Sequence, residues 1–262
     1  MRAYGVTQIT LPRKGRNMDY EAPLAAELSP ARQALDTIPW LARVGAATRE
    51  RLAAQAMLHR LPAGALVFEQ AETPAFALFL ISGALKLVGV RGAGEAVIEI
   101  VRPFEMALPA AVVSGQPYLL RARALEEAQV LLIGAERFRE ELARDSALCG
   151  AVLMCVSAQL RRQMRAAKSF RMRNAEERVA AYLAGLVEVV AGAAEIALTM
   201  DKSEIAAHLG MTRETFSRTL AGLAKHGVAV DGKRLHLRDI AAFRARFPYD
   251  PFIDGDDSGL LR

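Results

Sequence analysis

The sequence predicts an α+β protein: an N-terminal antiparallel β-barrel of the jelly-roll type, a long helix, and a C-terminal winged helix-turn-helix. Three observations lead to this fold class. Apolar residues repeat with a period of two between about residues 60 and 133, and with a helical period after Ala135. Near Gly210, two short helical patterns are separated by a sharp turn. The chain has 262 residues, which is enough for two domains with separate cores.

The barrel prediction rests on short apolar runs separated by turn residues. Helical periodicity comes first, over residues 30–58, where we expect Thr48 to be the N-cap of a helix that ends at Met57. The runs that predict strands are 66–68, 76–81, 85–90, 96–101 and 130–133. Turn residues such as glycine, serine and proline lie between these runs. Many short strands with regular turns are typical of a small barrel or jelly roll.

Two neighbouring stripes follow the helix that we predict for residues 142–172. The first stripe comprises Leu148, Val152, Cys155, Gln159 and Arg162, and the second comprises Leu153, Val156, Leu160 and Met164. One stripe can pack on the chain's own barrel while the other packs on a second copy of the same helix. We expect the first stripe to form the dimer interface. The alternative is the long core helix of a monomer.

The stretch 199–220 predicts two helices that cross at a turn. Their apolar faces are Ile205, Ala206 and Leu209 in the first helix, and Phe216, Leu220 and Leu223 in the second. Gly210 permits the positive φ of the turn, and Thr212 suits the N-cap of the second helix. A hairpin over 228–237, with Asp231-Gly232 at its tip, follows as a wing. This order is the winged helix-turn-helix pattern.

The outward face of the second helix carries groups that suit the edges of DNA bases. Arginine can donate two hydrogen bonds to guanine, glutamate can accept one from cytosine, and serine can contact several bases. We expect base reading by Arg213, Glu214, Ser217 and Arg218. We expect phosphate contacts from Lys202, Thr212, Thr215, Lys233 and Arg234. The alternative for this face is a solvated charged surface; the hairpin and the upstream basic run favour DNA.

These patterns divide the chain into five expected segments. They are a disordered basic extension (1–29), a β-barrel sensor domain (30–141), a dimerisation helix (142–172), a winged helix-turn-helix DNA-binding domain (173–247) and a flexible tail (248–262). For the first 17 residues an alternative is that translation starts at Met18.

Composition agrees with a DNA-binding protein of the cytoplasm. The formal net charge is +5, and a basic run between Arg161 and Arg173 meets no acid before Glu176. The chain has only two cysteines, which argues against a disulfide framework and favours a reducing compartment. No apolar run reaches the roughly 18 residues that predict a membrane span. We therefore expect a cytoplasmic protein with no membrane partner.

Three motifs resemble the Crp/Fnr superfamily of transcription regulators, over about residues 35–240. Residues 79–87, Phe-Leu-Ile-Ser-Gly-Ala-Leu-Lys-Leu, resemble its cyclic-nucleotide-binding-like sensor barrel. Residues 174–183 are similar to the start of the Fnr-type DNA domain, and residues 214–218, Glu-Thr-Phe-Ser-Arg, match its E-x-x-S-R recognition helix. The chain most resembles the Dnr- and FixK-type members, which lack the cluster-binding cysteines.

The resemblance implies a dimeric activator that reads two TTGAT-like half-sites in an inverted repeat and contacts RNA polymerase. It assigns the reading to Glu214, Ser217 and Arg218. Arg213 departs from the Fnr type, which has an apolar residue there, so the base at that position stays open. Dnr-type relatives respond to nitric oxide and associate with heme. The resemblance therefore points to a redox or gas signal, such as nitric oxide or oxygen limitation.

The sensor carries an incomplete set of ligand-holding residues. The family's nucleotide binders hold ribose and phosphate with a Gly-Glu pair and an Arg-Ser/Thr-Ala motif, and the nearest residues here are Glu105, Arg121 and Arg123. The glycine and the hydroxyl residue are absent, so we expect cyclic nucleotide binding to be lost. Two cysteines exclude a four-cysteine iron–sulfur cluster. A heme remains open, with His59 as the candidate ligand beside Met106 and the cysteines, as does regulation without any ligand.

Two other classes of protein are alternatives to a regulator. The sequence has no Ser-His-Asp arrangement, metal-ligand cluster, phosphate-binding loop or dinucleotide motif, so we expect neither an enzyme nor a metal site. The second rival is a cyclic-nucleotide-responsive regulator, or a nucleotide-binding signalling subunit without DNA function. The charged face from Arg213 to Arg218 argues against a subunit of that kind.

Overall fold

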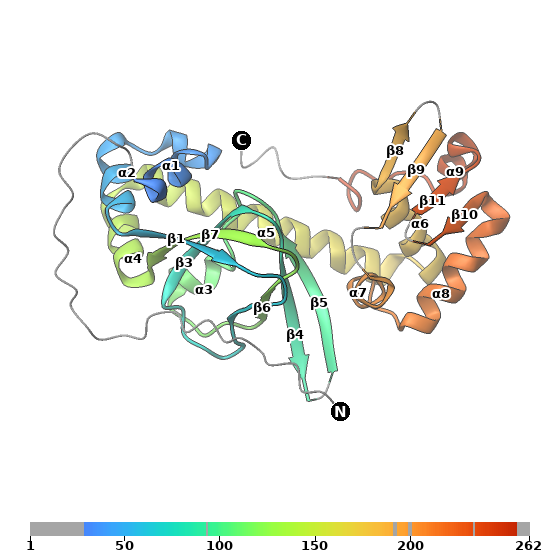
Figure 1. The fold of residues 1–262 in the computed structure, drawn as a ribbon, viewed down its shortest axis with the longest axis horizontal. Coiled ribbons are helices and arrows are strands. Elements are labelled where there is room, and N and C mark those ends of the chain that lie inside the picture. Colours follow the sequence, from blue (N-terminus) through green and yellow to red (C-terminus); the bar gives the residue numbers. More distant parts are fainter. Residues whose placement is uncertain (1–28, 93, 191–192, 199–200, 233, 256–262) are drawn as a thin grey trace. The chain divides into compact units, whose positions relative to one another are not determined.

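The computed structural model describes residues 29–92, 94–190, 193–198, 201–232 and 234–255 (Figure 1). The extension predicted for residues 1–29 lies outside the described residues except for Ser29. The chain divides into two compact units, and the division falls between Ala158 and Gln159. Among the described residues, no helix combines the length and the apolar character that crossing a membrane requires.

Three short helical segments open the first unit: α1 (Pro30–Asp36), the 3-10 helix η1 (Pro39–Arg43) and α2 (Ala46–Ala53). The expected helix capped by Thr48 is wrong at both ends. The N-cap is Gly45, and Thr48 is buried in the first turn, where its hydroxyl donates to Asp145 at 2.6 Å. The helix stops at Ala53 because the next residues pair with a strand far along the chain.

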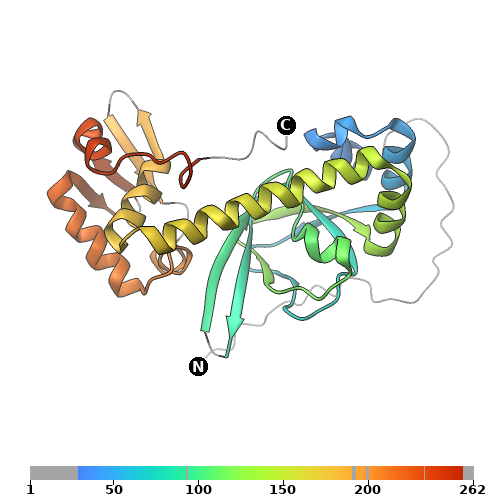
Figure 2. The ribbon, with the colours of Figure 1, turned by 180° about the vertical axis from the view of Figure 1, so that it is seen from behind.

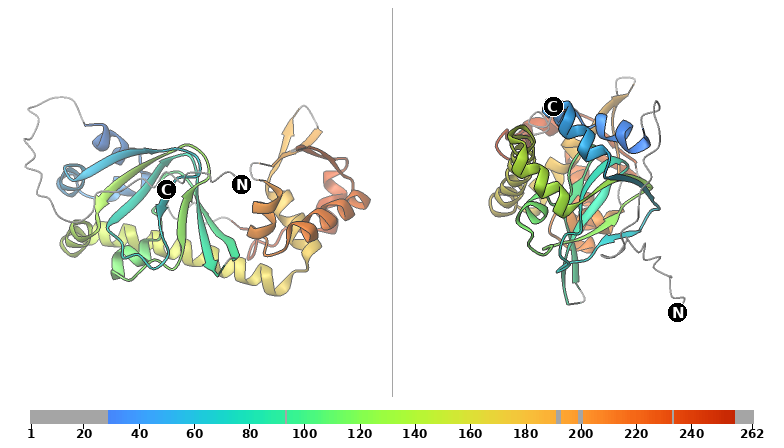
Figure 3. Two further views of the ribbon diagram at one scale, coloured as in Figure 1. Left: turned by 60° about the horizontal axis from the view of Figure 1, so that its bottom comes forward. Right: turned by 90° about the vertical axis from the view of Figure 1, so that its left-hand side faces the viewer.

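The barrel of the first unit consists of two antiparallel sheets (Figure 3). The strands are β1 (Ala56–Leu61), β2 (Leu66–Phe68), β3 (Phe76–Ser82), β4 (Leu85–Arg91), β5 (Gly94–Val101), β6 (Arg121–Ala124) and β7 (Ala128–Gly134), with helix α3 (Pro109–Ser114) between β5 and β6. One sheet has the order β1-β7-β3 and the other has the order β2-β6-β4-β5. The antiparallel barrel predicted from the sequence is therefore confirmed.

The β1-β7-β3 sheet separates two hydrophobic cores. Alternate residues of β7 point to opposite faces of the sheet. Val130 and Leu132 belong to the core inside the barrel, whereas Leu131 and Ile133 belong to the core beneath the helices. Trp40 of η1 completes the helical core and donates its indole N–H to the carbonyl of Phe104 at 2.9 Å.

The long helix differs from its predicted bounds. The segment from residue 135 is divided into α4 (Ala135–Arg144) and α5 (Ser146–Met172). Asp145, between them, has an extended backbone, and its carboxylate accepts the N–H groups of Ala147 (2.8 Å) and Leu148 (3.1 Å). An acid at this position caps the helix that follows. From Ser146, α5 runs without interruption (Figure 2).

The second unit is a winged helix-turn-helix. Its elements after α5 are α6 (Ala175–Gly185), β8 (Val187–Val190), β9 (Ala193–Ala197), α7 (Lys202–His208), α8 (Arg213–Gly222), the 3-10 helix η2 (Leu223–His226), β10 (Val228–Asp231), β11 (Arg234–Leu237) and α9 (Ile240–Arg246). The sheet order is β10-β11-β9-β8. A capping box fixes the start of α6, since Asn174 and Glu177 each accept the other's backbone N–H.

The tail, which we expected to be flexible from residue 248, is tied to α5 as far as Gly255. Asp254 accepts two hydrogen bonds from the guanidinium of Arg173, and Lys168 donates to the carbonyl of Phe252 at 3.3 Å. Acidic and backbone acceptors of the tail thus meet the basic run of α5. The remainder of the predicted tail, residues 256–262, lies outside the described residues.

Candidate nucleic-acid interface

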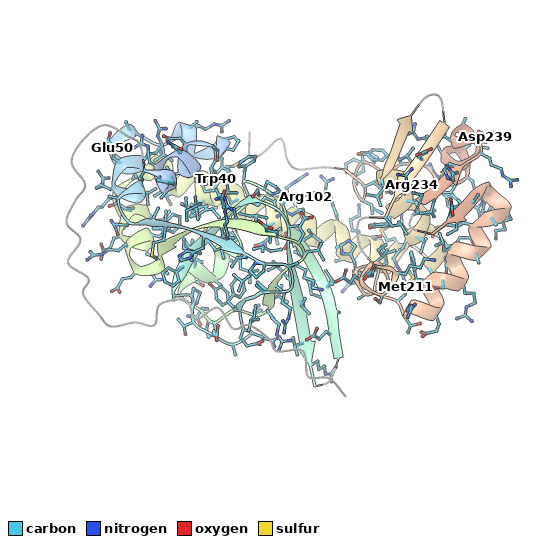
Figure 4. All side chains as sticks on the ribbon, viewed as in Figure 1. Trp40, Glu50, Arg102, Met211, Arg234 and Asp239 are labelled. Atoms are coloured by element: carbon cyan, nitrogen blue, oxygen red, sulfur yellow. The ribbon has the colours of Figure 1, made fainter. Side chains whose placement is uncertain are left out.

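Helices α7 and α8 meet at a tight turn that only glycine accommodates without strain. Gly210 has φ +63°, and Met211 donates its N–H back to the carbonyl of Ala206 at 2.9 Å. Figure 4 labels Met211, which follows the turn residue. Ala206 and Ile205 are buried at the helix crossing. The predicted helix-turn-helix is confirmed, with the predicted turn residue at its centre.

The two faces of α8 differ sharply in exposure. Phe216 and Leu220 are buried, as their spacing predicted. The four residues expected to read bases are all exposed: Arg213, Glu214, Ser217 and Arg218. They lie in the first two turns of the helix, the part that enters the major groove in proteins of this architecture. The fold therefore presents two guanidinium groups, one carboxylate and one hydroxyl together.

The first turn of α8 is held by Thr212, the predicted N-cap. Its hydroxyl accepts the N–H of Thr215 at 3.1 Å. Hydrogen bonds from the backbone N–H of Glu214 itself and from the Thr212 side chain lower the pKa of the Glu214 carboxyl. At neutral pH this side chain is therefore a carboxylate, which accepts hydrogen bonds and donates none. Among base edges it suits a donor such as the amino group of cytosine.

The residues expected to contact phosphate lie on three elements of this unit. Lys202 opens α7 and is half-buried, Thr212 and Thr215 lie at the start of α8, and Arg234 is exposed at the start of β11 (Figure 4). Lys233 lies outside the described residues. The hairpin predicted at Asp231-Gly232 is confirmed, because Asp231 pairs with Arg234 in the β10-β11 register.

The effector candidates of the barrel do not converge on its interior. Ala122 and Ala124 of β6 face the inner core, so Arg121 and Arg123 lie on the opposite face of the strand. Arg121 pairs with Glu69 at 2.8 Å and also with Glu95, which raises its pKa. Arg123 donates to the carbonyl of Gly64 at 3.5 Å. Neither guanidinium is positioned to hold a phosphate inside the barrel.

Glu105 serves a turn of the backbone. Its carboxylate accepts the N–H of Arg102 at 3.0 Å, and its own carbonyl accepts the N–H of Leu80 at 2.9 Å. Phe104, beside it, has φ +69°, and its N–H donates to the carbonyl of Leu80 at 2.6 Å. These contacts fasten the 102–108 segment to β3. The structure shows Glu105 in contacts that hold this turn of the backbone, and its expected contact with ribose stays a prediction.

The heme-ligand candidates are divided between two sides of a sheet. His59 pairs with Val130, whose side chain lies in the inner core, and the Nε2 atom of His59 is buried without a hydrogen-bond partner among the described residues. Met106 and Cys155 belong to the other core, beneath the helices. Cys149 is exposed. The imidazole of His59 has the chemistry of an axial heme ligand, but Met106 and Cys155 lie on the opposite side of the β1-β7-β3 sheet. Among the described residues, no group of three metal-ligating side chains is brought together.

The expected dimer stripe is wrong in its first three members. Leu148, Val152 and Cys155 are at most 5% exposed and pack in the chain's own helical core. Of the remaining members, Gln159 and Arg162 are partly buried. The neighbouring stripe is the open one, since Leu153, Leu160 and Met164 are 62%, 60% and 58% exposed. Both stripes have spacings of three and four residues, so only the distant residues that pack on α5 distinguish them.

The sequence did not predict the role of Arg178, a cation that contacts the turn of the helix-turn-helix. Arg178 of α6 donates from Nε to the carbonyl of Leu209 at 3.1 Å and from Nη1 to the carbonyl of Arg173 at 2.9 Å. Its guanidinium carbon lies 5.6 Å from the centre of the Phe170 ring. The sequence signal was a single arginine, preceded by Glu176 and Glu177, in the first turn of an amphipathic helix.

Two family profiles match the two units. A cyclic nucleotide-binding domain matches residues 58–145, and a Crp-like helix-turn-helix domain matches residues 177–246. The transcriptional activator protein Anr of Pseudomonas aeruginosa is 27% identical over 187 residues, which cover 68% of this chain and 75% of Anr. The nitrogen fixation regulation protein FixK of Azorhizobium caulinodans is 27% identical over 175 residues, which cover 63% of this chain and 68% of FixK.

Among solved structures, FixK2 from Bradyrhizobium japonicum has the same fold, with a TM-score of 0.62 at 20% identity, covering 74% of this chain and 98% of FixK2. The matched profiles follow each other in the order in which the structure places the barrel and the winged helix-turn-helix. The curated relatives are transcription regulators rather than enzymes. With a cyclic nucleotide-binding domain followed by a Crp-like helix-turn-helix domain, this chain belongs to the Crp/Fnr superfamily of DNA-binding transcription regulators.

Proposed function

We propose that the protein binds DNA as a homodimer, at an inverted repeat of TTGAT-like half-sites, and regulates transcription from that position. The observation that carries the proposal is the exposed face of α8, where Arg213, Glu214, Ser217 and Arg218 share the first two turns. Two arginines supply bidentate donors for guanine, and the carboxylate supplies an acceptor for cytosine. Arg213 is the residue on which the outermost base preference depends.

A gel-shift assay tests the base-reading role. The probe is a duplex that carries TTGAT-N4-ATCAA, and the competitor is the same duplex with scrambled half-sites. Arg218→Ala is expected to weaken specific binding by roughly 1–3 kcal/mol, the range for one bidentate base contact. The matched control is Arg244→Ala, an exposed arginine of α9 in the same unit, which should bind as the wild type does. Unchanged specific binding by Arg218→Ala would remove that residue from the reading face.

The dimer is proposed to form through the exposed stripe of α5, which replaces the stripe expected from the sequence. Leu153, Leu160 and Met164 each expose more than half of their side chains, on a helix long enough to pair with its symmetry mate. Two leucine-to-glutamate changes, at Leu153 and Leu160, should yield monomers in light scattering. Leu119→Glu changes a leucine that is 83% exposed elsewhere and should leave the dimer intact. A wild-type monomer at micromolar concentration would contradict the dimer.

For the signal, we propose a redox or gas response, such as nitric oxide or oxygen limitation, or regulation by abundance alone. Relatives of this chain include an Anr activator and a FixK regulator, and RNA polymerase is the partner that such activators imply. The buried Nε2 of His59 is the one observation that favours a heme. The test is an absorption spectrum of the purified protein after addition of heme, compared with that of His59→Ala. Absence of a heme band in the wild type would contradict heme binding and leave regulation without a heme.

A further inference from the structure

We propose that Arg178 is a positioning residue for DNA reading, because it fixes the turn between α7 and α8 to the C-terminal end of α5. The inference rests on the proposed reading role of α8. All of the groups that it invokes lie in the second unit, between Phe170 and Gly210. Arg178 itself contacts no base in this proposal; it acts through the turn that precedes the recognition helix.

The guanidinium of Arg178 joins the ends of two helices. Leu209 is the C-cap of α7, and its carbonyl accepts the Nε–H of Arg178 at 3.1 Å. Arg173 directly follows α5, and its carbonyl accepts the Nη1–H at 2.9 Å. Carbonyls at helix C-termini lack partners within their own helix, and a cation there also interacts favourably with the helix dipole. One planar group therefore satisfies two such carbonyls at once.

The aromatic ring of Phe170 lies against both the guanidinium of Arg178 and the turn at Gly210. The guanidinium is 5.6 Å from its centre, a cation–π distance. On the other side, a Cβ added at Gly210 would lie 3.1 Å from Cδ1 of this ring and would overlap its Cε1 atom. The turn therefore rests directly on Phe170. Glycine suits the φ of +63° at this turn, and an added Cβ would also displace the ring of Phe170, which is 47% exposed.

The position of Arg178 is itself fixed. It stands in the first turn of α6, where the reciprocal hydrogen bonds of Asn174 and Glu177 (2.9 and 3.0 Å) define the start of the helix. Three helix ends thus meet at one cation: the end of α5, the start of α6 and the end of α7. Helix α8 begins at Arg213, three residues after Gly210. A shift of the turn therefore redirects every side chain that we propose to read bases.

The geometry requires an arginine rather than any positive charge. The two acceptor carbonyls belong to different elements, and a planar guanidinium reaches both from fixed directions while it lies on the ring. A lysine places one compact ammonium at the end of a flexible stem and reaches one of them. A purely electrostatic role would be restored by lysine, whereas the proposed role would not.

The experiment compares Arg178→Lys and Arg178→Met with wild type, in the full-length protein at a temperature where each is folded. The specific probe is the TTGAT-N4-ATCAA duplex, and the non-specific probe has scrambled half-sites. We expect both variants to lose roughly tenfold in specific affinity, the equivalent of one charged hydrogen bond. Non-specific affinity, which depends on phosphate contacts, should change less than about twofold. Arg244→Met, an exposed arginine of α9, is the matched control.

Two readouts separate positioning from folding. Hydrogen exchange at Gly210 and Met211 should accelerate in both Arg178 variants, whether or not DNA is present. Gly210→Ala, which strains the turn at φ +63° and displaces Phe170 while Arg178 is intact, should reproduce the loss of specific affinity. Restoration by lysine, an equal loss on both probes, or unchanged exchange at the turn would each overturn the proposal. If wild type itself fails to prefer the TTGAT duplex, the proposed half-site is wrong, and the exchange experiment still decides the role of Arg178.

Discussion

The tail provides the sharpest test of the stability of the second unit. Arg173 donates to both carboxylate oxygens of Asp254, at 2.5 and 2.7 Å, and Asp254 also accepts the N–H of Asp250 at 2.9 Å. The side chains of the pair are only 12% and 18% exposed. Asp254→Asn removes the negative charge and one of the two acceptors while the shape of the side chain is kept. We predict that residues 248–255 then detach from α5.

The expected magnitude lies between two known cases. A hydrogen bond to a charged group contributes roughly 1.5–3 kcal/mol, whereas an exposed ion pair contributes about 0.2–1 kcal/mol. This pair is bidentate and mostly shielded, yet it lies at the surface of the unit, so we expect a loss of about 1–2 kcal/mol. That loss raises the equilibrium constant for local opening roughly 5- to 30-fold.

Hydrogen exchange of the tail amides measures this opening directly. Asp254→Asn should accelerate exchange at Phe252 and Ile253 by that factor, and Asp231→Asn, an exposed aspartate of the wing, should leave it unchanged. Equal exchange in Asp254→Asn and wild type would refute the reasoning, since the carboxylate would then contribute nothing to the closed tail.

The pH dependence of the tail has a defined sign. Burial alone would raise the pKa of Asp254, but hydrogen bonds from Arg173 and from the backbone of Asp250 outweigh it and lower the pKa. A carboxyl with a lowered pKa stabilises the folded form fully above its ordinary pKa of about 3.9 and ceases to do so as the pH falls through the lowered value. Opening of the tail in wild type should therefore rise below about pH 4.

Three further predictions concern the two units separately. Gly83→Ala places a Cβ 2.8 Å from the Cα of Ala128 at φ +81° and should destabilise the barrel by about 1–3 kcal/mol, measured in urea by the fluorescence of Trp40, the single tryptophan. Thr212→Ala should lower the free energy of opening of the first turn of α8 by about 1 kcal/mol, measured by hydrogen exchange, whereas Thr212→Ser keeps the capping hydroxyl and should leave it unchanged. Cyclic AMP or GMP at about 1 mM should leave the urea midpoint unchanged; a clear increase would contradict an apolar interior.

The recognition helix was predictable because everything that defines it is local. Phe216 and Leu220 are four residues apart, Thr212 caps the helix one residue before its start, and Gly210 makes the turn. Each signal lies within a dozen residues of the others, so a periodic pattern and a capping residue were sufficient. Once the buried face of α8 is known, the residues on the opposite side of the helix must be the exposed ones.

Features that depend on distant partners were not predictable in the same way. Strand β1 is defined by pairing with β7, in which Ala56 lies opposite Ile133, and its own residues continued the helical pattern that precedes them. Val152 and Leu153 are adjacent and both apolar, yet one is 2% and the other 62% exposed. Only the helical core beneath α5 decides which of the two is covered. Likewise, Asp254 of the tail accepts a hydrogen bond from Arg173, which lies 81 residues earlier in the chain.

The arrangement of charge in the barrel constrains what the sensor can recognise. An unpaired charge is costly to place in an apolar interior. The arginines of β6 lie on the outer face of the strand, where Arg121 pairs with Glu69 and Glu95 and Arg123 donates to the carbonyl of Gly64. Inside, aliphatic side chains surround the stacked rings of Phe68 and Tyr118, whose centres are 3.9 Å apart. Burial raises the pKa of Tyr118 well above its usual value, so it stays neutral as well. The part of an effector that entered this interior would therefore have to carry no unpaired charge, and the Nε2 atom of His59 is buried there without a hydrogen-bond partner among the described residues.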